Sequence, residues 1–198
     1  KIISVNSESG AMTDHSSWPT GLSLGSSEPW HTCVFDGKYV WFPPYNANKM
    51  LRIEASTGTM MPFDPANMMA RGAVLDVAEQ ALWTMPYTNV AQHRFVSRFT
   101  FSSLTVEVPQ QMTPLQDGTG FAGLVPTSSL APLEGETVVH TRYNNWPGGF
   151  ACTQYCFRAG LLVGDNMWMI PYRSSDIVKM HHHTGVMTRY TSWPAGIT

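Results

Sequence analysis

The feature that most constrains this chain is an internal repeat of about 47 residues. Three segments share an apolar run that contains a Trp and ends in Pro-Tyr, at positions 39–45, 81–87 and 166–172. A single unit of this kind cannot bury its apolar face alone, so repeated units stack on their neighbours and make a continuous core. The chain is therefore expected to fold as a repeat structure.

Two further landmarks recur along the chain. A Gly preceded by Thr or Ser follows a short apolar segment, at Gly10, Gly58 and Gly185. A Trp-Pro pair then closes the unit, at Trp18, Trp146 and Trp193. Residues 1–21 carry only these later landmarks, so they correspond to the second half of a unit.

Within a unit the pattern is that of short antiparallel strands. Asp36-Gly37 lies between two apolar segments and is a two-residue hairpin signal. Gly58 supplies the positive φ that a tight hairpin turn requires. A Pro at 44, 86, 126 or 171 ends a strand, because Pro cannot donate to the hydrogen-bond ladder. Each unit is therefore predicted to contain four strands, with the Trp on the second.

Four short strands in a repeat of this length are typical of a propeller blade. We predict an all-β fold, a β-propeller of about 4–5 four-stranded blades with one blade shortened, or a fragment of a larger propeller. The predicted parts of this single domain are a half-blade at 1–21 and blades at about 22–67, 68–113, 114–147 and 148–198. The blade at 114–147 is the shortened one, because its Thr141-Arg142-Tyr143 matches Thr188-Arg189-Tyr190 after too few residues.

The first full unit carries a set of residues at fixed spacings: Gly37, Val40, Trp41, Phe42, Asn48, Lys49, Arg52, Ile53, Thr57 and Gly58. This pattern resembles the blade repeat of the streptogramin-lyase and NHL-like group of β-propellers, and it extends in weaker form over nearly the whole chain. The resemblance implies a toroidal all-β fold, but such repeats serve enzymes, ligand binders and scaffolds alike. A lyase of this kind would need a His general base and a divalent ion, for which His31 and the preceding Glu28 are the candidates.

The charge of the chain bears on its partners. A formal net charge of −2 gives no basic surface, so we expect no nucleic-acid partner. Charged residues make up only 13% of the chain, and a surface so poor in charge is often covered by other protein chains. Since no apolar run approaches the length that crosses a bilayer, we expect no membrane-spanning segment.

The loops after each second strand and the connections between units should share one face, because strand direction alternates within a unit. That face gathers six aromatic residues: Trp18, Tyr45, Tyr87, Trp146, Tyr172 and Trp193. Aromatic rings with a polar group suit contact with a protein partner or a carbohydrate. The six are the predicted binding residues, and packing of one blade on the next is the alternative role for each of them.

No catalytic, phosphate-binding or dinucleotide motif is present. His181-His182-His183 is predicted to be a solvated turn, because successive side chains on a strand alternate and three adjacent histidines cannot all face one ion. Cys152 and Cys156 do not have a usual zinc spacing, and we expect buried free thiols. We therefore expect no catalytic residue, no metal and no cofactor.

Three functions stay open on these grounds. The favoured one is a non-enzymatic protein-interaction or scaffold module, such as an accessory subunit of a larger assembly. The second is a lectin-like binder of carbohydrate or another small ligand through the Trp and Tyr residues of the rim. The third is a metal-dependent, lyase-like propeller enzyme, although the sequence argues against an enzyme. The cellular compartment is left open.

Overall fold

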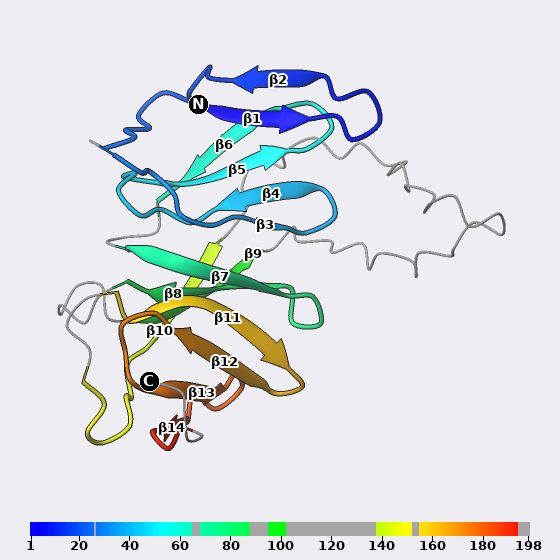
Figure 1. The fold of residues 1–198 in the computed structure, drawn as a ribbon. Coiled ribbons are helices and arrows are strands. Elements are labelled where there is room, and N and C mark those ends of the chain that lie inside the picture. Colours follow the sequence, from blue (N-terminus) through cyan, green and yellow to red (C-terminus); the bar gives the residue numbers. More distant parts are fainter. Residues whose placement is uncertain (26, 65–67, 88–94, 102–137, 152–154, 194–198) are drawn as a thin grey trace, which may run out of the picture.

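A computed structural model describes residues 1–25, 27–64, 68–87, 95–101, 138–151 and 155–193 (Figure 1). The described residues form fourteen β-strands in four antiparallel sheets, and they contain no helix. The predicted all-β class is therefore confirmed. Within the same ranges, no helix has the length and apolar character needed to cross a membrane.

The chain begins with a two-stranded hairpin and a four-stranded sheet. The hairpin pairs β1 (Ile2–Val5) with β2 (Met12–His15). The first four-stranded sheet runs in chain order through β3 (Val34–Phe35), β4 (Tyr39–Phe42), β5 (Met50–Glu54) and β6 (Met60–Phe63). Its first turn is the predicted one, with Gly37 at a φ of 104° and the Asp36 carboxylate accepting from the N–H groups of Lys38 and Tyr39.

The second four-stranded sheet contains β7 (Ala70–Asp76), β8 (Ala81–Pro86), β9 (Val96–Phe101) and β10 (Val138–Tyr143). Strand β10 pairs with β9, so it is not part of a separate shortened blade as predicted for 114–147. Strand β10 is the fourth strand of this sheet, and it pairs with backbone N–H and C=O groups of β9 that would otherwise be exposed at a sheet edge. The predicted boundary near 113 lies outside the described residues.

The third four-stranded sheet contains β11 (Phe157–Val163), β12 (Asn166–Pro171), β13 (Ile177–His181) and β14 (Met187–Tyr190). Figure 1 shows the sheets stacked along one direction, with the β1–β2 hairpin at one end and the third sheet at the other. The matched segments Thr141–Tyr143 and Thr188–Tyr190 are both on the fourth strand of their sheets. The sequence match was therefore sound, and only its assignment to a separate unit was wrong.

The N-terminal hairpin takes the place of the last two strands of a sheet. A Cβ on Gly58, in the turn between β5 and β6, would lie 2.9 Å from the His15 ring on β2. A Cβ on Gly185, in the turn between β13 and β14, would lie 2.5 Å from the Tyr143 ring on β10. Strand β2 of the hairpin therefore contacts the β5–β6 turn of the first sheet. Strand β10 of the second sheet contacts the β13–β14 turn of the third sheet in the same way.

Two apolar cores lie between the sheets. Trp41 and Met50 of the first sheet pack on Leu82, Phe99 and Phe101 of the second. A larger core between the second and third sheets contains Ala81, Trp83, Met85, Val96, Cys156, Phe157, Met167, Met169, Val178, Met180 and Met187. Strand β8 is buried along its whole length because its alternate side chains enter both cores. Flexible Met side chains fill much of the second core.

Candidate functional site

The three predicted tyrosines form a row along one side of the sheet stack, where the second strands end. Tyr45 follows β4, Tyr87 follows β8 and Tyr172 follows β12, so each leaves the second strand of its sheet. The ring centroids of Tyr45 and Tyr87 are 4.7 Å apart. Tyr155, which sequence reasoning missed, continues the row at 4.7 Å from Tyr87 and 6.1 Å from Tyr172.

Backbone hydrogen bonds between sheets hold this row together. The Ala70 N–H donates to the Pro44 carbonyl, and the Cys156 N–H donates to the Tyr87 carbonyl. The Tyr172 N–H donates in turn to the Cys156 carbonyl. The tyrosines therefore stand on rigid strand ends, and their spacing is set by the packing of the sheets.

Arginine side chains stack on the tyrosine rings. The Arg71 guanidinium carbon, from β7, lies 5.0 Å from the Tyr155 ring centroid and 4.7 Å from that of Tyr172. Arg158 stacks on Tyr172 and Arg173 on Tyr155, both within the distance of a cation–π contact. We call Tyr45, Tyr87, Tyr155, Tyr172, Arg71, Arg158 and Arg173 the tyrosine–arginine cluster.

The cluster is positively charged and short of hydrogen-bond acceptors. Nη1 of Arg71 is buried, and among the described residues it has no hydrogen-bond partner. Burial, then hydrogen bonding with Tyr155 and Tyr45, raises the pKa of Tyr87, so its phenol stays neutral. The charge of the cluster therefore comes from its arginines, and the arrangement favours an anionic ligand.

His31 and Glu28, the candidates for a lyase-like centre, do lie together beside this cluster. Nε2 of His31 is 3.3 Å from the Glu28 carboxylate, and the His31 ring is 4.1 Å from that of Tyr45. Burial, then repulsion from Arg71, lowers the pKa of His31. The nearby guanidinium charge repels a divalent cation, so this geometry gives no support to the metal-dependent lyase hypothesis.

The structure does not bring the three predicted tryptophans into the row. Trp18 lies 5.7 Å from Trp30 beside the first sheet. Trp146 stacks on Phe157 at the edge of the second core. Nε1 of Trp193 donates to the carbonyl of Ser175 at 2.6 Å. Each Trp therefore makes a packing contact or a local hydrogen bond, and a binding role for the three stays a prediction.

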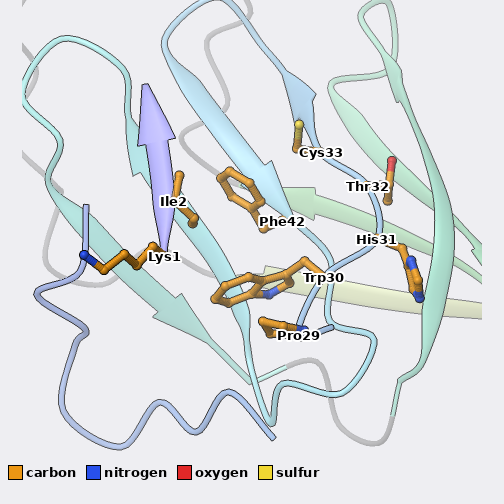
Figure 2. A pocket seen from close by; sticks show the side chains of 8 residues that line it. All are labelled: Lys1, Ile2, Pro29, Trp30, His31, Thr32, Cys33 and Phe42. Carbon is orange, nitrogen blue, oxygen red and sulfur yellow. The ribbon is translucent and has the colours of Figure 1, made fainter. Parts of the chain in front are cut away.

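An open pocket of about 410 Å³ adjoins the cluster through His31 (Figure 2). Lys1 and Ile2 of the N-terminal hairpin form one wall, and Trp30 and Phe42, 5.8 Å apart, form another. Its volume is in the range of small-ligand sites. The pocket extends the apolar surface available beside the cluster.

The outer face of the third sheet repeats a pattern that is buried in the other two. In each sheet a Trp on the second strand meets an aromatic ring on the fourth: Trp41 with Phe63, Trp83 with Tyr143, and Trp168 with Tyr190. Trp41 and Trp83 are fully buried by the next sheet. Trp168 is partly exposed, as the third sheet has no such neighbour among the described residues.

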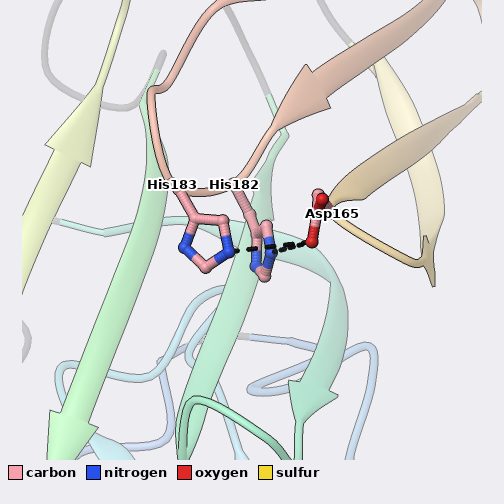
Figure 3. A group of neighbouring side chains, drawn as sticks. All are labelled: Asp165, His182 and His183. Carbon is pink, nitrogen blue, oxygen red and sulfur yellow. Dashed lines mark ion pairs between the residues drawn. The ribbon is translucent and has the colours of Figure 1, made fainter.

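His182 and His183 lie in a turn as predicted, and His183 is exposed, but His182 is buried, which corrects the prediction of a fully solvated turn (Figure 3). His182 is only 7% exposed, and its Nδ1 lies 2.9 Å from the Asp76 carboxylate. His183 lies beside it, with ring centroids 3.9 Å apart. The expected solvation of His182 was wrong because β13 ends at His181, so the alternation of strand side chains does not apply to the two residues that follow.

The cysteine prediction is also corrected in part. Cys33 is a free thiol, but it is exposed. Cys156 is buried and disulfide-bonded, and its partner lies outside the described residues. The neighbouring Tyr155 has a φ of 58°, a left-handed conformation that is uncommon for a residue other than Gly.

Comparison with known proteins finds no matching family model, no similar curated protein and no similar solved structure. The fold and the geometry of its side chains therefore carry the functional argument alone.

Proposed function

We propose that this chain is a non-enzymatic protein-interaction module whose sheets are blades of a β-propeller or of a piece of one. The outer face of its third sheet docks an apolar β-sheet of a partner chain. The observation that carries this proposal is the exposure of Trp168 at the position where Trp41 and Trp83 are fully buried. Charged residues make up only 13% of the chain, and this low share is consistent with a surface that is covered in an assembly.

The surroundings of Trp168 support a sheet as the occupant. Leu161 pairs directly with Trp168 in the ladder, so the two side chains share the outer face. Val34 and Val74 pair with Trp41 and Trp83 in the same way, and both pack into the cores between sheets.

Exposed apolar side chains make the outer face a continuous patch. Leu161 and Val163 are each 55% exposed, and Ile170 is 48% exposed. An exposed patch of this kind marks an interaction site, and in the other two sheets the equivalent face is covered by another sheet.

Native mass spectrometry of the natively purified protein tests this proposal. We expect a discrete complex with another chain, which Leu161→Glu dissociates because it places a charge in the apolar interface. Val186→Glu is the matched control, since Val186 is 61% exposed in the turn between β13 and β14. A species of 22.0 kDa alone, or a complex that Leu161→Glu leaves intact, would contradict the proposal.

A second candidate function is the binding of an acidic carbohydrate at the tyrosine–arginine cluster. Nη1 of Arg71 has no hydrogen-bond partner among the described residues and lies beside stacked tyrosine rings, which favours a ligand with both a carboxylate or sulfate and a ring face. The proposed protein-binding surface is the outer face of the third sheet, whereas the cluster lies where the second strands end, so different substitutions test the two candidates.

A glycan array that contains acidic and neutral sugars tests the second candidate. Binding should be confined to acidic glycans and should be lost in Arg71→Met and Tyr172→Ala. Tyr190→Ala is the control, because this tyrosine is similarly exposed but belongs to the outer face. Equal binding of neutral glycans, or binding that survives Arg71→Met, would count against the cluster as the site.

A further inference from the structure

At the strand ends opposite the tyrosine–arginine cluster, three turns bring histidines and carboxylates together. Asp76 ends β7 and Glu79 lies in the turn between β7 and β8, while Asp165 comes from the turn between β11 and β12. His182 and His183 follow β13. The backbone N–H of His182 donates to the backbone carbonyl of Asp165 at 3.0 Å. This bond holds the turn after β13 against the turn between β11 and β12.

His182 is buried with one ring nitrogen satisfied and the other free. Its Nδ1 lies 2.9 Å from the Asp76 carboxylate, which is itself 5% exposed. Its Nε2 is buried and has no hydrogen-bond partner among the described residues. That nitrogen points towards the Asp165 carboxylate, 3.9 Å away (Figure 3).

His183 repeats the same arrangement at the protein surface. Its Nε2 lies 3.8 Å from the same Asp165 oxygen, and its Nδ1 lies 3.8 Å from Glu79. The ligand atoms of Asp165, His182 and His183 all lie within 4.8 Å of one another. Two imidazoles and one carboxylate therefore face a common point.

We propose that Asp165, His182 and His183 bind one divalent transition-metal ion of the Zn²⁺ type. Ligands of tetrahedral Zn²⁺ at about 2.1 Å are roughly 3.4 Å apart, so distances of 3.8 and 3.9 Å need only a small closure around the ion. Neutral imidazole nitrogens and one carboxylate are ligands that this ion accepts, and a fourth position stays open to water.

The surrounding carboxylates have the placement expected around metal-binding histidines. Such a histidine donates its other ring N–H to a carboxylate, which fixes the tautomer and orients the ring. Asp76 occupies that position for His182, and Glu79 is nearest to the equivalent nitrogen of His183. Arg98 pairs with Glu79 at 3.1 Å, so Asp76 and Asp165 supply the uncompensated charge that attracts a cation.

Titration of the metal-free full chain with ZnCl₂ by calorimetry, and with CoCl₂ by visible absorption, tests the proposal. We expect one ion per chain and the intense visible bands of tetrahedral Co²⁺. Asp165→Asn and His183→Gln should each weaken binding at least about tenfold, the scale on which even supporting residues of metal sites act. Both side chains are largely exposed, so both variants should fold, which circular dichroism checks.

His181→Gln is the matched control, because His181 adjoins the other two histidines but is not among the proposed ligands. Its Zn²⁺ affinity should stay within about twofold of that of the wild type. Loss in His181→Gln equal to that in His183→Gln, with Asp165→Asn unaffected, would show ordinary affinity of a histidine run and overturn the proposal. Absence of saturable binding would overturn it as well, and would leave the cluster as ion pairs.

Discussion

Trp83 and Trp168 occupy equivalent positions but differ in burial. The stability lost when each is replaced by Ala tests whether the outer face of the third sheet is exposed in solution. Trp83 is fully buried in the core between the second and third sheets. A buried Trp removes about 150–250 Å² from water, worth roughly 4–6 kcal/mol at ~25 cal/mol per Å². This agrees with the ~3–5 kcal/mol usually lost when a core Trp is replaced by Ala. Trp83→Ala should therefore cost about 3–5 kcal/mol.

Trp168→Ala should cost far less, about 1 kcal/mol. Trp168 contacts Tyr190 and Lys179 within its own sheet, but among the described residues no further sheet covers it. Surface substitutions with few contacts usually change stability little. The ratio of the two costs therefore measures how much of the Trp168 side chain is covered in solution.

Urea denaturation followed by far-ultraviolet circular dichroism measures both costs without relying on Trp fluorescence. With a slope of ~2 kcal/mol per M, the midpoint should fall by roughly 2 M for Trp83→Ala and by about 0.5 M for Trp168→Ala. Measurement at two protein concentrations excludes self-association as a source of stability. Equal losses in the two variants would refute the reasoning, because Trp168 would then be covered in the isolated chain.

Three further predictions concern stability. Gly72→Ala should destabilise the chain by about 1–3 kcal/mol in urea denaturation, because the added Cβ would lie 2.9 Å from the backbone of Ala159; an unchanged midpoint would contradict this close approach. Arg189→Ala should cost about 2 kcal/mol, because it leaves the buried Asp176 carboxylate without the guanidinium that lies 2.8 Å away. A loss below about 0.5 kcal/mol in urea denaturation would argue against this ion pair. Burial lowers the pKa of His140 to about 4 from the ordinary 6.5, so the unfolded chain binds the extra proton first and stability should fall between pH 6.5 and 4. Removal of this histidine in His140→Gln should reduce that acid sensitivity, and a nuclear magnetic resonance titration that places its pKa near 6.5 would contradict the assignment.

Much of the strand arrangement could be predicted because local signals and the repeat agree. Asp36-Gly37 forms the expected turn, and Trp41 and Trp83 lie in cores between sheets. The convergence of Tyr45, Tyr87 and Tyr172 also followed from strand direction alone. These features depend on spacing within one unit, which the sequence displays directly.

Features that depend on which sheets lie side by side could not be predicted in this way. Tyr155 and Arg71 join the tyrosine row from the beginning of the first strands, where the repeat has no marked residue. His182 is buried because Asp76, 106 residues earlier, lies across the boundary between two sheets. Strand β10 was assigned to a separate unit because residues 102–137 interrupt the spacing between it and β9.

Asp36 and Asp76 occupy equivalent positions in two sheets, but they make different hydrogen bonds. Asp36 directly follows the first strand of its sheet and Asp76 ends the first strand of its own, each two residues after the Val that pairs with the Trp. Asp36 accepts a hydrogen bond from Nε1 of Trp41 at 2.6 Å. Asp76 pairs with His182 of the next sheet, and Nε1 of Trp83 is buried without a hydrogen-bond partner among the described residues.

An unpaired buried N–H costs about 1–3 kcal/mol, so the Asp76–His182 contact must offset that loss. A hydrogen bond between neutral groups contributes only about 0.5–1.5 kcal/mol, whereas bonds to charged groups reach ~1.5–3 kcal/mol. Asp76 is a carboxylate, so its hydrogen bond with Nδ1 of His182 is a bond to a charged group and belongs to the stronger class. The proposed metal ion would bind at Nε2, which is buried beside Asp165 and has no hydrogen-bond partner among the described residues.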